Sequence, residues 1–362
     1  PMSDTPQNLL IRGVNWLGDA IMTLPAVTRL REALPKTRFT LLSHEKLAGL
    51  WAHTAHFDQV LTFAKGESPF VISKRLKPKD FDAVLILPNS FRTALEAWHA
   101  GIPRRIGYSG NWRSPLLTHA IAPRPEAIPM QKRMPIDIEY RLINHLKPQT
   151  FPESAHHIHQ YLHLAQHLGA SSKPLAPQLE RSENAPVFSA TEKPRPYIGL
   201  IAGAEYGPAK RWPTEHFIET ASQLIEQRQA HVLLLGGSGD QDTAAEIADA
   251  LPADHHTNLA GQTTLPELVS ALAACDAVLT NDTGPMHVAA AAGAPVIVPF
   301  GSTSPDLTGP GLPDNPLSPN QLLRTTADCS PCFLRKCPID FRCLKEITPA
   351  DAVAAVERVL AQ

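Results

Sequence analysis

The chain has 362 residues, more than one hydrophobic core ordinarily organises, so we expect two domains. Hydrophobic residues make up 43% of the chain and charged residues 19%, which excludes a disordered tail and favours a soluble globular protein. The formal net charge of −2 excludes a global attraction to nucleic acid or to a membrane.

The first half alternates short apolar runs with segments of helical spacing. The expected strands cover 8–14, 37–43 and 81–88, and the expected helices cover 15–35 and 92–102. Strands that alternate with helices predict a parallel sheet. No apolar stretch reaches the roughly 18 residues of a membrane span, and the N-terminus lacks the build of a signal peptide. We therefore expect a cytoplasmic protein.

Three clusters of basic residues lie in the first half of the chain, although the net charge of the whole chain is close to zero. They lie at 73–80, 103–113 and 131–135. Such clusters are usually solvated faces, but together they could also meet an acidic partner.

The second half repeats the alternation after a segment, 171–196, that is rich in Pro, Ser and charge and is interpreted mainly as a linker. The expected strands are 197–203, 230–237, 277–282 and 294–301, and the expected helices are 213–229, 240–251, 265–276, 284–293 and 348–362. This order predicts a doubly wound sheet, and such sheets bind ligands beyond the carboxyl ends of their strands.

Four small polar residues, Asn281 to Gly284, stand between the strand expected at 277–282 and an Ala-rich helix. Free backbone N–H groups and the helix dipole favour an anion such as phosphate at this position. The alternative is an ordinary helix cap, for which Asp282 and Thr283 are suitable residues. His287, taken alone, is more typical of a core histidine than of a ligand.

Two further strand-end stretches carry charged residues. The loop 203–213 presents Lys210 and Arg211, which suit a phosphate clamp or, alternatively, a solvated basic pair beside a packed Trp. The stretch 13–26 places Gly18 and Asp19 at the start of the first helix, where Asp19 is either a functional carboxylate or an N-cap.

Together these three stretches resemble the ADP-heptose:lipopolysaccharide heptosyltransferases of glycosyltransferase family 9, over nearly the whole chain. The stretches 203–213 and 281–305 most resemble the heptosyltransferase II branch of that family. The resemblance implies an α/β GT-B fold of two Rossmann-like, doubly wound parallel-sheet domains that face a cleft. It also implies an inverting glycosyltransferase that uses ADP-heptose and needs no cofactor.

The resemblance assigns roles to individual residues. Asp19 matches the family's proposed general base, and Lys210 matches the lysine that contacts the donor phosphate. Asp240 falls near the family's acidic ribose contact. The donor-binding turn corresponds to Asp282, Thr283, Gly284 and His287.

The resemblance also implies that the two domains bind different substrates. We expect an acceptor-binding domain over 1–175, a linker over 176–195, a donor-binding domain over 196–348, and a closing helix over 349–362 that packs back on the first domain. The expected acceptor is the first heptose of the lipopolysaccharide inner core, reached by peripheral contact with the cytoplasmic face of the inner membrane. The open alternatives are heptosyltransferase I or another family 9 enzyme with a different acceptor, a non-catalytic nucleotide-sugar binding protein, and a sugar-nucleotide epimerase.

Two clusters of potential metal ligands remain. The C-terminal cysteines follow a C-x2-C-x4-C-x5-C spacing that could hold a structural zinc, although a packed Cys-rich loop explains them as well. They are Cys329, Cys332, Cys337 and Cys343. The histidines at 156, 159, 163 and 167 share one helical face and are expected to be surface imidazoles without a catalytic role.

Overall fold

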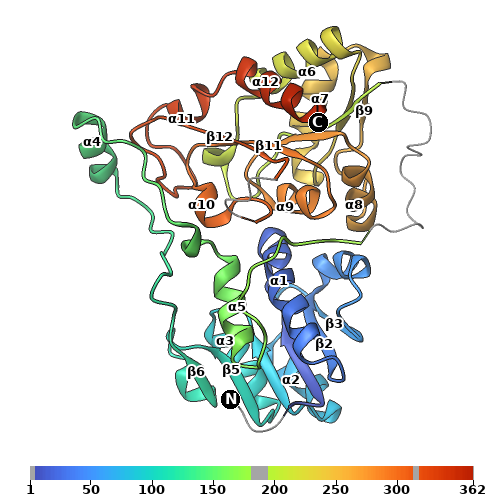
Figure 1. Ribbon diagram of the computed structural model, residues 1–362, viewed down its shortest axis with the longest axis vertical. Coiled ribbons are helices and arrows are strands. Elements are labelled where there is room, and N and C mark those ends of the chain that lie inside the picture. The colour runs from blue at the N-terminus through green and yellow to red at the C-terminus, as the bar shows by residue number, and fades with distance from the viewer. Residues whose placement is uncertain (1–4, 181–194, 313–317, 362) are drawn as a thin grey trace. The chain divides into compact units, whose positions relative to one another are not determined.

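The computed structural model describes residues 5–180, 195–312 and 318–361 (Figure 1). The chain forms two compact units. Unit 1 comprises Pro1–Ala127 and His156–Pro177, and unit 2 comprises Ile128–Ala155 and Gln178–Gln362. Most of the linker expected over 176–195 lies outside the described residues. Within the described ranges, no helix combines the length and the apolar character that are needed to cross a membrane.

The described part of unit 1 contains one six-stranded parallel sheet in the order β3-β2-β1-β4-β5-β6. In register, Arg12 at the end of the central strand pairs with Leu42 on one side and Ile86 on the other. The strands are β1 (Asn8–Arg12), β2 (Arg38–His44), β3 (Gln59–Phe63), β4 (Ala83–Ile86), β5 (Arg104–Tyr108) and β6 (His119–Ile121). The helices are α1 (Leu17–Ala33), α2 (Pro69–Leu76), α3 (Phe91–His99) and α5 (Ile158–Gln166), with 3₁₀ turns η1 (Glu45–His53), η2 (Lys77–Lys79) and η3 (Ser114–Leu116).

The described part of unit 2 contains a second six-stranded parallel sheet, in the order β12-β11-β10-β7-β8-β9. Its strands are β7 (Tyr197–Ile201), β8 (His231–Leu234), β9 (His256–Asn258), β10 (Ala277–Thr280), β11 (Val296–Phe300) and β12 (Gln321–Arg324). Its helices are α4 (Pro135–Ile143), α6 (Thr214–Arg228), α7 (Gln241–Ala250), α8 (Leu265–Ala273), α9 (Gly284–Ala291), α10 (Pro305–Thr308), α11 (Arg342–Lys345) and α12 (Pro349–Leu360). Its 3₁₀ turns are η4 (Glu153–Ala155), η5 (Pro208–Lys210), η6 (Ser238–Asp240) and η7 (Ala253–His255).

The two sheets share one topology, because each begins in its centre, winds outward, and then resumes on the other side of the first strand. The switch in winding direction falls between β1 and β4 in unit 1 and between β7 and β10 in unit 2. In open parallel sheets of this kind, the loops beyond the carboxyl ends at the switch diverge and leave room for a ligand. The polar stretches singled out in the sequence follow β1, β7 and β10, which form these two switch points.

The central strands are apolar because helices cover both faces of a parallel sheet. All four residues of β4 and all four of β10 are buried. Trp212, which is 2% exposed, packs edge-on against Phe217 in the unit 2 core and donates from Nε1 to the backbone oxygen of Ile347 at 2.9 Å. The indole thereby fixes the loop between β7 and α6 to the segment before α12.

The closing helix α12 belongs to unit 2, so the expectation that it packs back on the first domain is wrong. Its apolar stripe, which includes Ala352 and Val356, is buried against α6 and strands β10 to β12. Arg228 of α6 also pairs with Glu357 of α12. The spacing of Ala and Val along α12 indicates an apolar face but does not specify which sheet that face covers.

Residues 128–155 also join unit 2, which interrupts the single span 1–175 expected for the first domain. Ile138 of α4 is buried in the unit 2 core. Arg133 donates from Nε to the backbone oxygen of Pro331 at 2.6 Å, and the Phe151 amide donates to Asp306 at 2.9 Å. The segment therefore leaves unit 1 after residue 127 and returns to it at residue 156.

Candidate active site

Asn281 organises the switch point of unit 2. Its side chain is fully buried directly after β10, where Nδ2 donates to the backbone oxygen of Ala202 at 2.7 Å and Oδ1 accepts from the Trp212 amide at 2.9 Å. These bonds tie the end of β10 to both ends of the loop that follows β7. Because all of these atoms are buried, the contacts hold the loop in one conformation.

Asp282 and Lys210 form a buried ion pair at this point. Lys210 Nζ lies 2.7 Å from Asp282 Oδ2, and the two side chains are 15% and 5% exposed. Thr303, after β11, donates from Oγ1 to the same carboxylate oxygen at 2.5 Å. A buried pair needs such additional bonds because desolvation of both charges offsets much of their attraction. Lys210 follows β7, Asp282 follows β10 and Thr303 follows β11. The contacts of Asp282 therefore join three strand ends and hold Lys210 in place.

A second cation that the sequence reasoning missed, Arg335, lies beside the Lys210 loop. Tyr206 has the Lys210 ammonium 5.1 Å from its ring centre and the Arg335 guanidinium 5.0 Å from it. The Ala209 amide donates to the backbone oxygen of Arg335 at 3.0 Å. Gly207, at φ +151°, permits this approach, since a Cβ there would lie 2.6 Å from the same oxygen. The basic pair at 335–336 was the available signal for this contact.

The N-terminus of α9 lies at the same strand end, as expected for an anion site. Thr283 is its N-cap, but the Thr283 side chain makes no capping hydrogen bond. Asp282 is engaged with Lys210 and Thr303, so neither side chain serves as the ordinary cap considered above. Gly284 begins the helix, and His287, one turn on, is 5% exposed.

Asp240 lies beside the end of β7. Its Oδ2 accepts from the Gly237 amide at 2.9 Å, which fixes the carboxylate within the turn η6. Gly203 lies so close that a Cβ there would fall 1.9 Å from Asp240 Oδ1. A side chain at residue 203 would therefore displace this carboxylate, and the structure brings Asp240 to the loop that carries Lys210.

In unit 1, Asp19 lies in the first turn of α1, two residues after the helix begins at Leu17. The N-cap is Trp16, so the interpretation of Asp19 as an N-cap is wrong. The Tyr161 hydroxyl of α5 donates to Asp19 Oδ1 at 3.3 Å. Burial and the charge of Asp19 raise the pKa of Tyr161 well above its ordinary value, which keeps this hydroxyl protonated as a donor. The helix N-terminus further favours a carboxylate at this position.

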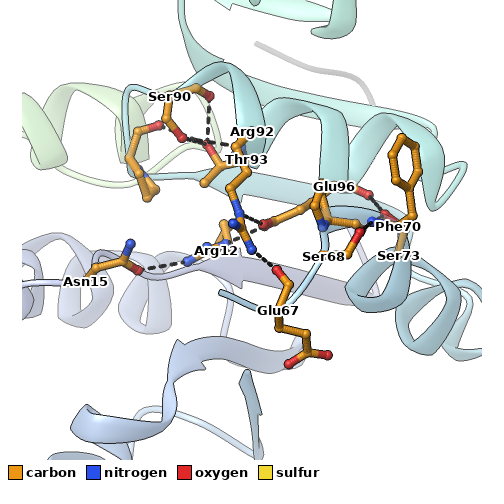
Figure 2. Close-up of polar contacts among 12 residues, drawn as sticks. Arg12, Asn15, Glu67, Ser68, Phe70, Ser73, Ser90, Arg92, Thr93 and Glu96 are labelled. Atoms are coloured by element: carbon orange, nitrogen blue, oxygen red, sulfur yellow. Dashed lines mark hydrogen bonds and ion pairs between the residues drawn. The ribbon is translucent and has the colours of Figure 1, made fainter. Parts of the chain in front are cut away.

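A buried ion pair supports the end of β1 (Figure 2). Arg12 Nε lies 2.7 Å from Glu96 Oε2 of α3, and both side chains are 2% exposed. Arg92 approaches the other carboxylate oxygen at 3.2 Å and also donates to the backbone oxygen of Glu67. Burial lowers the pKa of Arg12, and the charge of Glu96 offsets part of that effect. Glu96 thus joins β1, α3 and the loop before α2.

The histidine cluster is only partly at the surface. His156, which precedes α5, is fully buried, so its interpretation as a surface imidazole is wrong. His163 lies 2.9 Å from the Tyr108 hydroxyl and stacks on the Tyr108 ring. His163 thus packs α5 against β5, and the proposed site uses none of these histidines.

The four C-terminal cysteines line one small cavity together with Ser302 and Phe341. Among residues 5–180, 195–312 and 318–361, no three ligating side chains are arranged to hold a metal ion, so the structure lends no support to zinc as the alternative to a packed loop. The Cys343 thiol donates to Cys329, and this bond lowers the pKa of Cys329 to about 7. Thiol packing accounts for the burial of three of the four cysteines.

Comparison with known proteins agrees with this geometry. The sequence pattern of glycosyltransferase family 9 (heptosyltransferase) matches residues 70–341. Lipopolysaccharide heptosyltransferase 2 of Escherichia coli K12 is 32% identical over 83% of this chain and 85% of its own. Lipooligosaccharide heptosyltransferase 2 of Haemophilus influenzae is 32% identical over 84% and 86%. The solved E. coli ADP-heptose LPS heptosyltransferase II superimposes with a TM-score of 0.78 at 29% identity, covering 98% of this chain and 99% of that one.

Two doubly wound parallel units that match this solved structure confirm the expected GT-B fold and define a glycosyltransferase. The identity to curated relatives extends over most of the chain, and the family pattern covers the stretches that follow β7 and β10. The chain belongs to glycosyltransferase family 9, the heptosyltransferase family.

Proposed function

We propose that this protein is an inverting heptosyltransferase that moves L-glycero-D-manno-heptose from ADP-heptose to the first heptose of the lipopolysaccharide inner core. The observation that carries the proposal is the match, over more than four fifths of the chain, to relatives named heptosyltransferase 2. The matching solved structure is named for ADP-heptose as well.

The donor diphosphate is assigned to unit 2. Lys210 supplies a fixed cation, and the N-terminus of α9 adds backbone N–H groups and the positive end of its dipole. Asp282 is itself an anion and would repel a diphosphate, so its role is to position Lys210. Thr283, Gly284 and His287 form the donor turn, and Asp240 suits the hydroxyl groups of the ribose.

The acceptor proton is assigned to Asp19 of unit 1. As the acceptor oxygen bonds to the anomeric carbon, the bond from that carbon to the diphosphate breaks and ADP leaves with the electron pair. The hydroxyl proton passes to Asp19, and the configuration at the anomeric carbon inverts. A single displacement needs no covalent intermediate. Tyr161 donates to Asp19 Oδ1 and thereby orients this carboxylate.

The proposed acceptor is a lipid-anchored, negatively charged saccharide. The protein would therefore act at the cytoplasmic face of the inner membrane by peripheral contact, with no nucleic acid partner. The basic clusters of the first half are suited to this contact, since they can meet anionic headgroups without insertion into the bilayer.

The alternative is a family 9 enzyme with a different acceptor, such as heptosyltransferase I. Two defined core acceptors, one with and one without the first heptose, separate the two activities. The proposal expects ADP-heptose to be consumed with the first and not with the second. Equal or preferential use of the acceptor without heptose would favour the alternative.

A further inference from the structure

Helix α2 of unit 1 exposes apolar side chains at its N-terminal turn. Phe70 and Val71 are each 49% exposed, whereas Ile72 and Leu76 are buried against the sheet. At 100° per residue, Phe70 and Val71 lie on the side of the helix that faces away from the core. Figure 2 shows Phe70 at this turn, beside the contact in which Ser73 of α2 donates to the backbone oxygen of Glu96 at 2.9 Å.

Helix α3 extends this apolar surface. The Phe70 ring meets the His99 ring edge-on, with 5.0 Å between ring centres, so the two helices present one continuous face. Trp98, next to His99, is also 49% exposed. Aromatic side chains that leave half of their area in water are typical of surfaces that meet a lipid–water interface.

Basic residues follow the apolar side chains along α2 and into η2. The exposed face of α2 continues through Lys74 and Arg75, and η2 adds Lys77 and Lys79. The segment 65–80 holds five basic and two acidic residues, a net charge of +3 in a chain of net charge −2. One of the two acids, Glu67, is already paired with Arg75 at 2.8 Å. Lys74 and Lys77 point toward solvent without such a neutralising partner among the described contacts.

We infer that the exposed face of α2, η2 and the end of α3, here called the α2–α3 face, docks on an anionic phospholipid surface. The four basic residues within 74–79 resemble the clusters of Lys and Arg that bind acidic lipid headgroups. The neighbouring side chains of Phe70 and Trp98 suit the boundary between the headgroups and the acyl chains. A protein partner would need a larger apolar area than Phe70, Val71 and Trp98 provide. Charge complementarity therefore favours the bilayer.

The position of the α2–α3 face relates membrane docking to the delivery of the acceptor. This step rests on the proposed function. The loop before α2 receives Arg92, which pairs with Glu96, which in turn holds Arg12 at the end of β1. Asp19 follows the same strand end. The start of α2 thus lies at the edge of the unit 1 sheet that carries the proposed base, where a lipid-anchored acceptor would arrive. Turn η2 lies at the opposite edge, where Asn8 at the start of β1 donates from Nδ2 to the backbone oxygen of Lys79 at 2.8 Å.

Sedimentation with vesicles tests the inference on the whole protein. Vesicles of equal parts phosphatidylethanolamine and phosphatidylglycerol should carry down the native protein, and vesicles of phosphatidylcholine should not. Lys74→Glu/Lys77→Glu should weaken binding to the anionic vesicles about 20-fold or more, and Phe70→Ser/Trp98→Ser should weaken it roughly 10-fold. High salt should release the native protein. Lys36→Glu/Lys345→Glu makes the same charge change at exposed lysines outside the face and should weaken binding far less.

Native protein that stays in the supernatant with anionic vesicles would overturn the inference, as would equal binding by the face variants and the control. Transfer to a water-soluble acceptor without lipid should be unchanged in the face variants. If the native protein transfers no heptose to that acceptor but still binds the vesicles, the proposed function fails while the docking face stands.

Discussion

Asp19 combines two roles that one substitution can separate. In the first turn of α1 it gains from the helix dipole, a contribution of about 0.3–1 kcal/mol, and as a general base it would contribute about 10²- to 10⁴-fold to the rate. Asp19→Asn should therefore lower the melting temperature only slightly while turnover falls at least about 100-fold. ADP binding, measured by calorimetry, should stay unchanged. Turnover within a few-fold of the parent would remove Asp19 from the chemistry.

Tyr161 should tune that carboxylate. Its hydroxyl donates to Asp19 Oδ1, and a hydrogen bond to the charged form of an acid lowers the pKa of that acid. Tyr161→Phe should therefore raise the pKa of Asp19, so that the acidic limb of the kcat/KM profile moves to higher pH. Tyr140→Phe, at an exposed tyrosine of α4, is the matched control. A profile that does not move would leave Tyr161 with a packing role alone.

Lys210 and Asp282 should be tested as a pair, because removal of one charge leaves the other buried without its partner. Lys210→Ala alone should cost about 3–5 kcal/mol of unfolding free energy, since Asp282 is left unpaired. Lys210→Met/Asp282→Asn should recover most of that stability. Turnover with ADP-heptose should nevertheless remain roughly 10- to 100-fold below the parent, which is the value of one charge-assisted hydrogen bond. Native kinetics in the folded double variant would show that Lys210 does not act on the donor.

At the scale of elements, α5 should make the stability of unit 1 depend on pH. Burial lowers the pKa of His157, just before α5, from 6.5 to about 4. Because the folded state binds its proton more weakly than the unfolded chain, the contribution of His157 is complete above pH 6.5 and is lost as the pH falls toward 4. The loss should approach about 3 kcal/mol. Denaturant unfolding of the native chain and His157→Gln measures it, and equal pH dependence in the two proteins would contradict it.

The elements that sequence reasoning found are the strongly patterned ones. The runs at β1, β4, β7 and β10 are apolar because central parallel strands are covered on both faces. The edge strands β6, β9 and β12 were missed, because each has three or four residues and no fully buried member. Strands β3 and β5 were missed as well, although each holds at least one buried residue. Short half-exposed strands carry little pattern.

At the scale of the whole molecule, the sequence predicted two doubly wound units but not how the chain is shared between them. The passage of residues 128–155 into unit 2 depends on Ile138 and Arg133 meeting groups nearly 200 residues away. Local periodicity cannot encode such contacts. The same limit applies to the candidate site. Asp282 and Lys210 could be predicted because they belong to strand-end motifs. Thr303, Arg335 and Tyr161 could not, because only tertiary contacts bring them to the site.

Product analysis of one reaction tests the central claim most directly. The native protein is mixed with ADP-heptose and a core acceptor that ends in the first heptose, and the product is examined by mass spectrometry and NMR. The account predicts an acceptor heavier by one heptose, an anomeric configuration opposite to that of the donor, and ADP released in equal amount. ADP-heptose that remains intact, or that changes its stereochemistry when no acceptor is present, would contradict heptosyl transfer.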